Sequence, residues 1–204
     1  MKAVIVDTGS ANLLSLRKAI SQVGYESTIT TRPEDILGAE KIFLPGVGAF
    51  AAVMKNLKSK NLDEALRATM NSGSTSILGI CLGMQILGDS SEEGAQEKGL
   101  SLLNGISRKL EPSSHIKVPH VGFNSVKVTK SSILLKEVDL DLDFYFVHSY
   151  AMLPSESVAT VGVTEHGVEF TSVIENGAGI FGVQFHPEKS NKHGLKILKN
   201  FLEV

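Results

Sequence analysis

The sequence lacks several features that mark whole classes of protein. It has one cysteine in 204 residues, which excludes an intrachain disulfide framework and a cysteine-rich metal site. No apolar run reaches the roughly 18 residues that a transmembrane helix needs. The first apolar run stops at Asp7 and is too short for a signal peptide. These absences predict a cytoplasmic protein that does not enter the membrane.

The sequence also lacks an excess of charge of either sign. There are 20 basic and 22 acidic residues, well interspersed, so no broad basic field is available to attract nucleic acid or anionic lipid. Small molecules and proteins are therefore the expected partners. A hydrophobic content of 42% is enough for a sizeable core, and no linker or repeat interrupts it. We expect residues 1–204 to form a single domain.

The order of apolar runs predicts the fold class. In the first half, β-rich runs alternate with segments of helical periodicity, which favours a mostly parallel central sheet flanked by helices. After about residue 100 the runs become shorter, and they predict an antiparallel β addition in the second half. The expected strands are residues 2–7, 27–31, 41–44, 76–80, 126–129, 144–148, 158–164, 170–174 and 180–185. Helices are expected at residues 13–23, 50–57 and 82–87 and near the end of the chain, where the lysines of the last helix should face solvent.

Cys81 lies between two glycines where a predicted strand meets a predicted helix. Counting alone favours a buried structural cysteine. However, small residues on both sides suit a nucleophile elbow, a tight turn that lifts a reactive side chain out of the sheet. The following helix would favour a thiolate and leave the backbone N–H of Leu82 free to stabilise an oxyanion.

A thiolate nucleophile needs an imidazole and a group that orients it. His186 and Glu188 supply both, because a predicted strand ends at His186 and Pro187 prevents its regular continuation. Of the other histidines, His120 and His148 flank expected functional loops, and their own role is ambiguous. The remaining three are expected at the surface: His115, His166 and His193. No group of residues has metal-ligand spacing, so no metal is expected.

A glycine-rich loop follows the predicted strand at residues 41–44. Val47 and Gly48 in this loop could offer a second oxyanion donor, although such turns are more often plain connections. The first strand is not followed by a Gly-x-Gly-x-x-Gly motif, and there is no phosphate-binding loop with Lys-Ser/Thr. Nucleotide binding is therefore poorly supported, and no cofactor is expected.

Several strings together resemble a known family. LGICLGMQ (78–85) and GVQFHPE (182–188) are similar to the two hallmark motifs of class I glutamine amidotransferases. Within that class, four strings resemble the glutaminase subunits of imidazole glycerol phosphate synthase, an enzyme of histidine biosynthesis. They are PGVGAF (45–50), KVPHVGFN (117–124), YFVHSY (145–150) and the continuation of the second motif through Lys189 and Ser190.

The resemblance implies a role for each motif. Cys81 would attack the side-chain amide of glutamine, forming a γ-glutamyl thioester and releasing ammonia, with His186 as proton carrier and Glu188 as its orienting group. The oxyanion hole would come from Val47, Gly48 and Leu82. The residues implied in substrate binding are Gly48, Gln85, Glu93, Ser149 and Tyr150, with Glu93 as a partner for the α-ammonium group.

The same resemblance implies a partner. The family forms a heterodimer with a cyclase subunit of the (β/α)8-barrel type, which uses the ammonia to make imidazole glycerol phosphate and an aminoimidazole carboxamide ribotide. Positions that match the partner interface are His120, Phe123, Asn124, Tyr145 and Lys189. Phe123 departs from the family, which usually has Trp there. Phenylalanine keeps the apolar ring but lacks the indole N–H donor.

Three alternatives remain. The chain could serve a different acceptor synthase, although relatives of that kind often have His at the position of Met84 and show no match to KVPH. It could be a non-catalytic binding protein of the same fold, although all three triad members are present. A peptidase-like hydrolase also uses a Cys–His pair, and it would hydrolyse bulky γ-glutamyl peptides without a synthase partner.

Overall fold

The structure is a computed structural model that describes the whole chain except residues 10, 94–96, 112–115, 139–143 and 156–159. Its main element is an eight-stranded sheet in which five parallel strands continue into three antiparallel ones. In spatial order the strands are β2 (Thr28–Thr30), β1 (Ala3–Val6), β3 (Lys41–Gly46), β4 (Ser76–Cys81), β13 (Ile180–Val183), β12 (Val168–Glu175), β11 (Thr160–His166) and β8 (Lys127–Val128). This arrangement confirms the predicted fold class.

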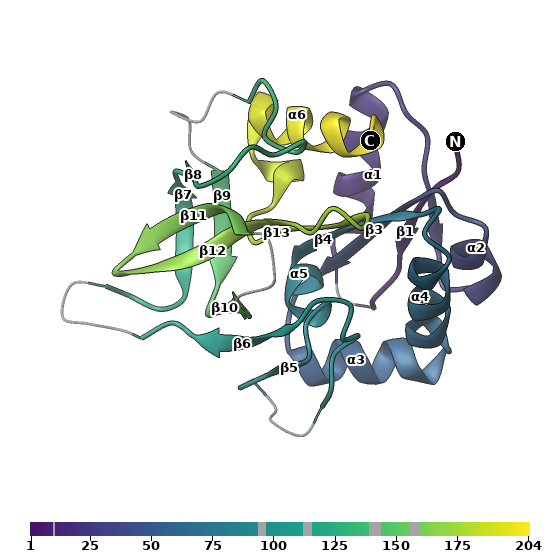
Figure 1. Cartoon of the computed structure of the whole chain (residues 1–204), viewed down its shortest axis with the longest axis horizontal. Helices are drawn as coiled ribbons and strands as arrows, with labels where there is room; N and C mark the ends of the chain where they lie inside the picture. The colour runs from purple at the N-terminus through teal and green to yellow at the C-terminus, as the bar shows by residue number, and fades with distance from the viewer. Residues whose placement is uncertain (10, 94–96, 112–115, 139–143, 156–159) are drawn as a thin grey trace.

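Helices cover both faces of the parallel half (Figure 1). One face carries α1 (Leu13–Gln22) and α6 (Asn191–Leu202), and the other carries α2 (Pro33–Leu37), α3 (Phe50–Ser59), α4 (Leu62–Asn71) and α5 (Leu82–Ile86). Side chains of β1 alternate between the two cores, because successive residues of a strand point to opposite faces. Ala3 and Ile5 pack with α1 and α6, whereas Val4 and Val6 pack with the other helices.

Two small sheets complete the described part. The first joins β10 (Tyr150–Pro154), β6 (Gly105–Lys109) and β5 (Ser90–Ser91). The second is an antiparallel ribbon of β7 (His120–Asn124) and β9 (Phe144–His148), in which His120 is opposite His148 and Phe123 is opposite Tyr145. We refer to it as the β7–β9 ribbon. The sequence pattern did not predict β5, β6, β7, β10, α2 or α4.

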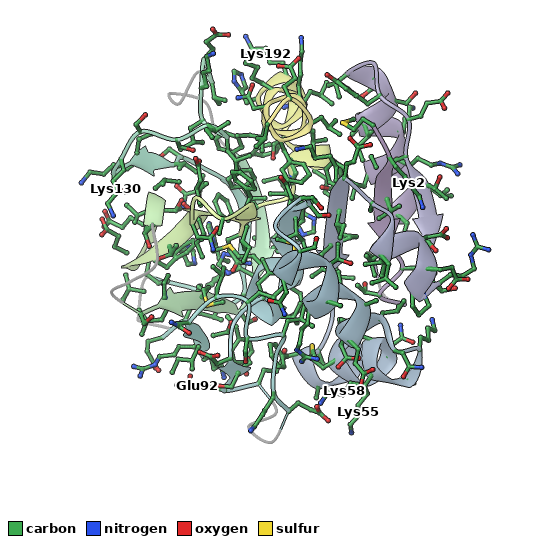
Figure 2. All side chains as sticks on the ribbon, turned by 45° about the vertical axis from the view of Figure 1, so that its right-hand side comes forward. Lys2, Lys55, Lys58, Glu92, Lys130 and Lys192 are labelled. Carbon is green, nitrogen blue, oxygen red and sulfur yellow. The ribbon has the colours of Figure 1, made fainter. Side chains whose placement is uncertain are left out.

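The last helix shows one wrong expectation and one confirmed. His193 is buried, not exposed, because it shares the inner face of α6 with Ile197 and Asn200 at helical spacing. The lysines of α6 do reach the surface, where Lys196 pairs with Glu137. Figure 2 shows the labelled charged side chains around the outside of the molecule: Lys2, Lys55, Lys58, Glu92, Lys130 and Lys192. His115 and the first two residues of the expected strand at 158–164 lie outside the described residues.

Candidate active site

The turn between β4 and α5 has the geometry of a nucleophile elbow. Cys81 adopts φ 55° and ψ −113°, a strained conformation for a residue with a side chain. A Cβ atom at Gly83 would overlap the carbonyl oxygen of Leu44, and one at Gly79 would lie 2.7 Å from backbone atoms of Met84. Both flanking glycines are therefore needed for the turn to pack against its neighbours.

His186 and Glu188 form a buried pair. The Nδ1 atom of His186 lies 2.9 Å from Oε1 of Glu188, and both side chains are about 95% buried, with 5% and 6% of their area exposed. Since an ionised carboxylate only accepts hydrogen bonds, Nδ1 carries a proton and donates it. The other ring nitrogen, Nε2, is buried and has no hydrogen-bond partner of regular geometry among the described residues.

The electrostatic setting of His186 favours the imidazolium. Burial lowers the pKa of His186, but the interactions of the ring with the Cys81 sulfur and with Glu188 outweigh burial and raise the pKa to about 9. The sheet explains why two residues so far apart in sequence interact. β13 pairs with β4 in parallel, with Val183 opposite Ile80, so both strands end at the same edge of the sheet.

A pocket of about 360 Å³ opens beside the sulfur of Cys81. All the residues that the sequence predicted for the oxyanion hole and the substrate are in its wall. The lining residues are Val47, Gly48, Cys81, Leu82, Gln85, Glu93, Pro119, Val147, His148, Ser149 and Tyr150. The tertiary structure thus brings five separate segments of the chain to one cavity.

The glycine loop approaches the elbow closely. Gly48 has φ +90°, where a side chain would be strained, and no other atom would contact a Cβ there. The hydroxyl of Thr8 donates to the carbonyl oxygen of Pro45 at 3.0 Å and ties the end of β3, just before the loop, to the segment that follows β1. Val47 and Gly48 are exposed, so their peptide groups border the pocket rather than the core.

Two polar residues of the pocket are already partly engaged. Both N–H groups of the Gln85 amide are used, one donated to the carbonyl oxygen of Tyr150 at 2.8 Å and one to Oε1 of Gln184 at 3.2 Å. One carboxylate oxygen of Glu93 accepts the N–H of Phe50 at 2.9 Å, at the start of α3. Gln85 therefore offers only its oxygen to a ligand, and Glu93 offers its second oxygen.

Comparison with known proteins decides the family. The family model "Glutamine amidotransferase class-I" matches residues 4–204. The chain belongs to the class I glutamine amidotransferases. It is 47% identical to "Imidazole glycerol phosphate synthase subunit HisH" of Moorella thermoacetica, over 98% of this chain and 93% of the relative. It is 41% identical to the protein of the same name from Dehalococcoides mccartyi, over 98% and 96%.

Solved structures show the same fold at low identity. A chain described as a glutamine amidotransferase has a TM-score of 0.77 at 16% identity and covers 98% of this chain and 97% of its own. A putative GMP synthase subunit from Thermoplasma acidophilum has a TM-score of 0.75 at 17% identity, covering 100% of this chain and 92% of its own. The shared architecture of this amidotransferase therefore extends across almost the whole chain.

The residues predicted for a partner interface fall into two groups. Phe123 is exposed, its ring contacts that of Tyr145 with centroids 5.4 Å apart, and Lys189 places its ammonium 5.3 Å from the centre of the Tyr145 ring. His120 and Asn124 point the other way. His120 is buried, and Asn124 is only partly exposed.

His120 and Asn124 take part, with His148, in a hydrogen-bond chain that runs in one direction. Nδ1 of His148 faces the carbonyl oxygen of Tyr150 at 2.9 Å and must donate to it, which leaves Nε2 to accept from Nδ1 of His120 at 3.1 Å. Nε2 of His120 then accepts from the amide of Asn124 at 3.2 Å. Burial lowers the pKa of His120 to about 4 and that of His148 to about 3, so both rings are neutral near pH 7.

One polar residue beside the sulfur of Cys81 was not predicted from the sequence. Gln184 is completely buried, and its amide nitrogen lies 3.6 Å from the Cys81 sulfur. A signal for it was present, because Gln184 is a polar residue two positions before His186 in an otherwise apolar extended segment. Residues two apart in such a segment point to the same side.

Proposed function

We propose that this amidotransferase is the glutaminase subunit of an imidazole glycerol phosphate synthase, hydrolysing glutamine to glutamate and ammonia through a thioester on Cys81. The observation that carries the proposal is the elbow of Cys81, which opens onto a pocket beside the buried His186–Glu188 pair. The names of relatives that are 41–47% identical over nearly the full chain support the choice of synthase.

The arrangement supports a complete catalytic cycle. The Cys81 thiolate attacks the side-chain amide carbon of glutamine, and the carbonyl oxygen gains the electron pair of the C=O bond. The N–H of Leu82 and a peptide N–H of the Val47–Gly48 loop would stabilise this oxyanion. The tetrahedral intermediate collapses as the C–N bond breaks, and His186 Nε2 gives its proton to the departing nitrogen, so ammonia leaves and a thioester remains.

The second half of the cycle restores the thiolate. His186, now neutral at Nε2, takes a proton from water as the water oxygen attacks the thioester carbon. The C–S bond then breaks, its electron pair returns to the Cys81 sulfur, and glutamate is released. Glu188 keeps its hydrogen bond to Nδ1 in both halves, which holds the ring in one tautomer and stabilises the imidazolium.

The pocket supplies groups suited to the amino-acid end of glutamine. The oxygen of Gln85 and the second oxygen of Glu93 are acceptors, which suit an α-ammonium group. Gly48, Ser149 and Tyr150 line the same cavity and would complete the contacts with the substrate. No cofactor is required for these steps.

We further propose that a barrel-type cyclase binds the outer face of the β7–β9 ribbon as the other half of a heterodimer and receives the ammonia. Phe123, Val121 and Tyr145 give this face an apolar, aromatic character, with Lys189 beside it as a cation. The ribbon adjoins the pocket through Pro119 and Val147, so a partner seated there would lie next to the site of ammonia release.

We further propose that residues 1–204 form one amidotransferase domain. We expect the protein in the cytoplasm, where a reducing environment keeps the catalytic thiol of Cys81 free. In the described part of the chain, no helix has the length and apolarity to cross a bilayer.

Reconstitution tests the proposal. The chain is mixed with a barrel cyclase subunit and its phosphoribosyl substrate, and glutamate and imidazole glycerol phosphate are measured with glutamine as nitrogen source. We expect both products in equal amounts, weak glutaminase activity without the partner, and no activity for Cys81→Ala. Glutamate without imidazole glycerol phosphate would indicate another acceptor synthase. No glutamate under any condition would refute the proposed glutaminase activity.

A further inference from the structure

The sulfur of Cys81 has two polar neighbours besides the catalytic histidine. On one side is the carbonyl oxygen of Val147 at 3.8 Å, which can only accept a hydrogen bond. On the other is the side-chain amide nitrogen of Gln184 at 3.6 Å, which can only donate. The carbonyl suits a protonated sulfur, whereas the amide N–H suits a sulfur that carries negative charge.

The orientation of the Gln184 amide is determined by its neighbours. Tyr150 presents a carbonyl oxygen to Gln85, so the Gln85 nitrogen must face it, and the second N–H of that nitrogen points to Oε1 of Gln184. If the Gln184 amide were reversed, two NH₂ groups would face each other and an oxygen would face the sulfur. The hydrogen-bond network therefore keeps the Gln184 nitrogen toward Cys81.

Gln184 is also held by its backbone. It follows β13 directly, and its N–H donates to the carbonyl oxygen of Ser172 at 2.9 Å. The side chain is completely shielded from solvent, so water does not compete for its N–H. A hydrogen bond to a charged atom is stronger in such surroundings than in water.

We infer that Gln184 is a further catalytic residue, whose side-chain amide donates a hydrogen bond to the sulfur of Cys81 and stabilises the thiolate. The inference rests on the proposed function, because it gives Gln184 a part in the same reaction. The bond acts twice in each cycle: it holds the thiolate before attack on glutamine, and it stabilises the sulfur again when the C–S bond of the thioester breaks.

A purely structural explanation of the same contacts is that Gln184 only pairs with Gln85 inside the core. The structural role and the donor role predict different behaviour of the sulfur. A purely structural glutamine would change stability when replaced, but it would leave the pH dependence of Cys81 reactivity unchanged. A donor to the sulfur would change that pH dependence directly.

The experiment uses Gln184→Met, which has similar volume and no N–H donor, and measures alkylation of the full chain by iodoacetamide across pH. Cys81 is the single cysteine of the chain, so the alkylation rate reports on this sulfur alone. We expect the midpoint of the rate–pH profile to move upward by about one to two pH units, and glutamine turnover in the complex with the cyclase to fall roughly 10- to 100-fold.

Two further variants make the outcome decisive. Gln184→Glu keeps an acceptor for Gln85 but places a carboxyl group against the sulfur, and it should move the midpoint at least as far. Gln22→Met, on the exposed end of α1, is the matched control and should change neither quantity. An unchanged midpoint in either Gln184 variant that retains the wild-type circular dichroism would overturn the inference.

Failure of the proposed function would look different. If the wild-type chain shows no glutaminase activity with any cyclase partner, the function is wrong, yet the alkylation profiles still test whether Gln184 acts on the sulfur. If the wild type is active and the Gln184 variants keep both its turnover and its profile, the function stands and only the role of Gln184 is refuted.

Discussion

The hydroxyl of Ser190 donates to the carbonyl oxygen of His186 at 2.7 Å and accepts the N–H of Tyr145 at 3.0 Å. The N–H of His186 in turn donates to the carbonyl oxygen of Tyr145 at 2.8 Å. These bonds close a ring that joins His186 to β9 of the ribbon. Ser190 is completely buried, so the ring is shielded from water.

Replacing Ser190 should therefore disturb both stability and catalysis. Ser190→Ala removes the acceptor of the Tyr145 N–H and one of two donors to the carbonyl oxygen of His186, which also accepts the N–H of Lys189. The loss should lower the free energy of unfolding by about 1 to 3 kcal/mol. A small displacement of His186 should lower kcat by about 10- to 100-fold. Denaturant unfolding and steady-state kinetics measure the two effects. Ser131→Ala, at an exposed site, is the control, and equal kcat values in the two variants would contradict the prediction.

Glu188 should set the pH at which His186 loses its proton. Interaction with this carboxylate helps to raise the pKa of His186 to about 9, so Glu188→Gln should lower that pKa and reduce kcat by on the order of 10³-fold. Titration of the His186 ring by NMR checks the direction.

The same raised pKa also affects stability. His186 has a higher pKa in the folded chain than the value of about 6.5 expected in the unfolded chain. Its stabilising contribution is therefore complete below about pH 6.5 and is lost as the pH rises through 9. Wild-type stability should fall over this range relative to Glu188→Gln, and parallel stability curves for the two proteins would argue against the linkage.

The neutral histidines predict sensitivity to acid. His148 has a pKa of about 3 when folded, so between about pH 6.5 and that value the unfolded chain binds a proton that the folded chain does not. The contribution of neutral His148 to the free energy of unfolding is complete above pH 6.5. It falls by roughly 1.4 kcal/mol per pH unit as the pH decreases below that value. His148→Gln should flatten this slope in urea unfolding measured from pH 7 to 4, with His193→Gln as a comparison. A slope unchanged in His148→Gln would count against the neutral chain of histidines.

The elbow should tolerate no side chain at Gly83. Gly83→Ala forces a Cβ onto the carbonyl oxygen of Leu44, so soluble yield and melting temperature should fall sharply. Gly73→Ala is the control, since Gly73 has φ +75° but open space around it, and it should lose only about 1 kcal/mol from backbone strain. Similar melting temperatures for the two variants would show that the elbow relaxes.

Phe123 should contribute to partner binding without taking part in the chemistry. Phe123→Ala removes an exposed ring that packs on Tyr145, so the dissociation constant for the cyclase should rise by about 10-fold or more. Basal glutamine hydrolysis by the isolated chain should stay unchanged. Binding measured by calorimetry separates the two effects. Leu37→Ala provides the control, because Leu37 is an exposed apolar residue of α2, which lies on the other side of the molecule from the ribbon (Figure 1). A Phe123→Ala chain that binds as tightly as wild type would place the interface elsewhere.

Much of the parallel core could be predicted from local pattern. The strands around residues 2–7 and 76–80 are continuous apolar runs, and helix α1 follows from apolar spacing that stops before Gly24. The elbow was equally local, since each of the two glycines flanking Cys81 lies only two positions from it. Short or irregular strands such as β6 and β7 were missed because their pairing partners are distant and their own patterns are weak.

The sequence by itself determined which residues could do chemistry: one thiol, an imidazole followed by a carboxylate, and a turn that only glycine allows. Tertiary structure alone decided what surrounds them. The pairing of β13 with β4 brings Gln184 and His186 to the sulfur of Cys81, and packing turns His120 inward but leaves Phe123 exposed. Such placements depend on contacts between residues that are far apart in the chain, and no local periodicity encodes them.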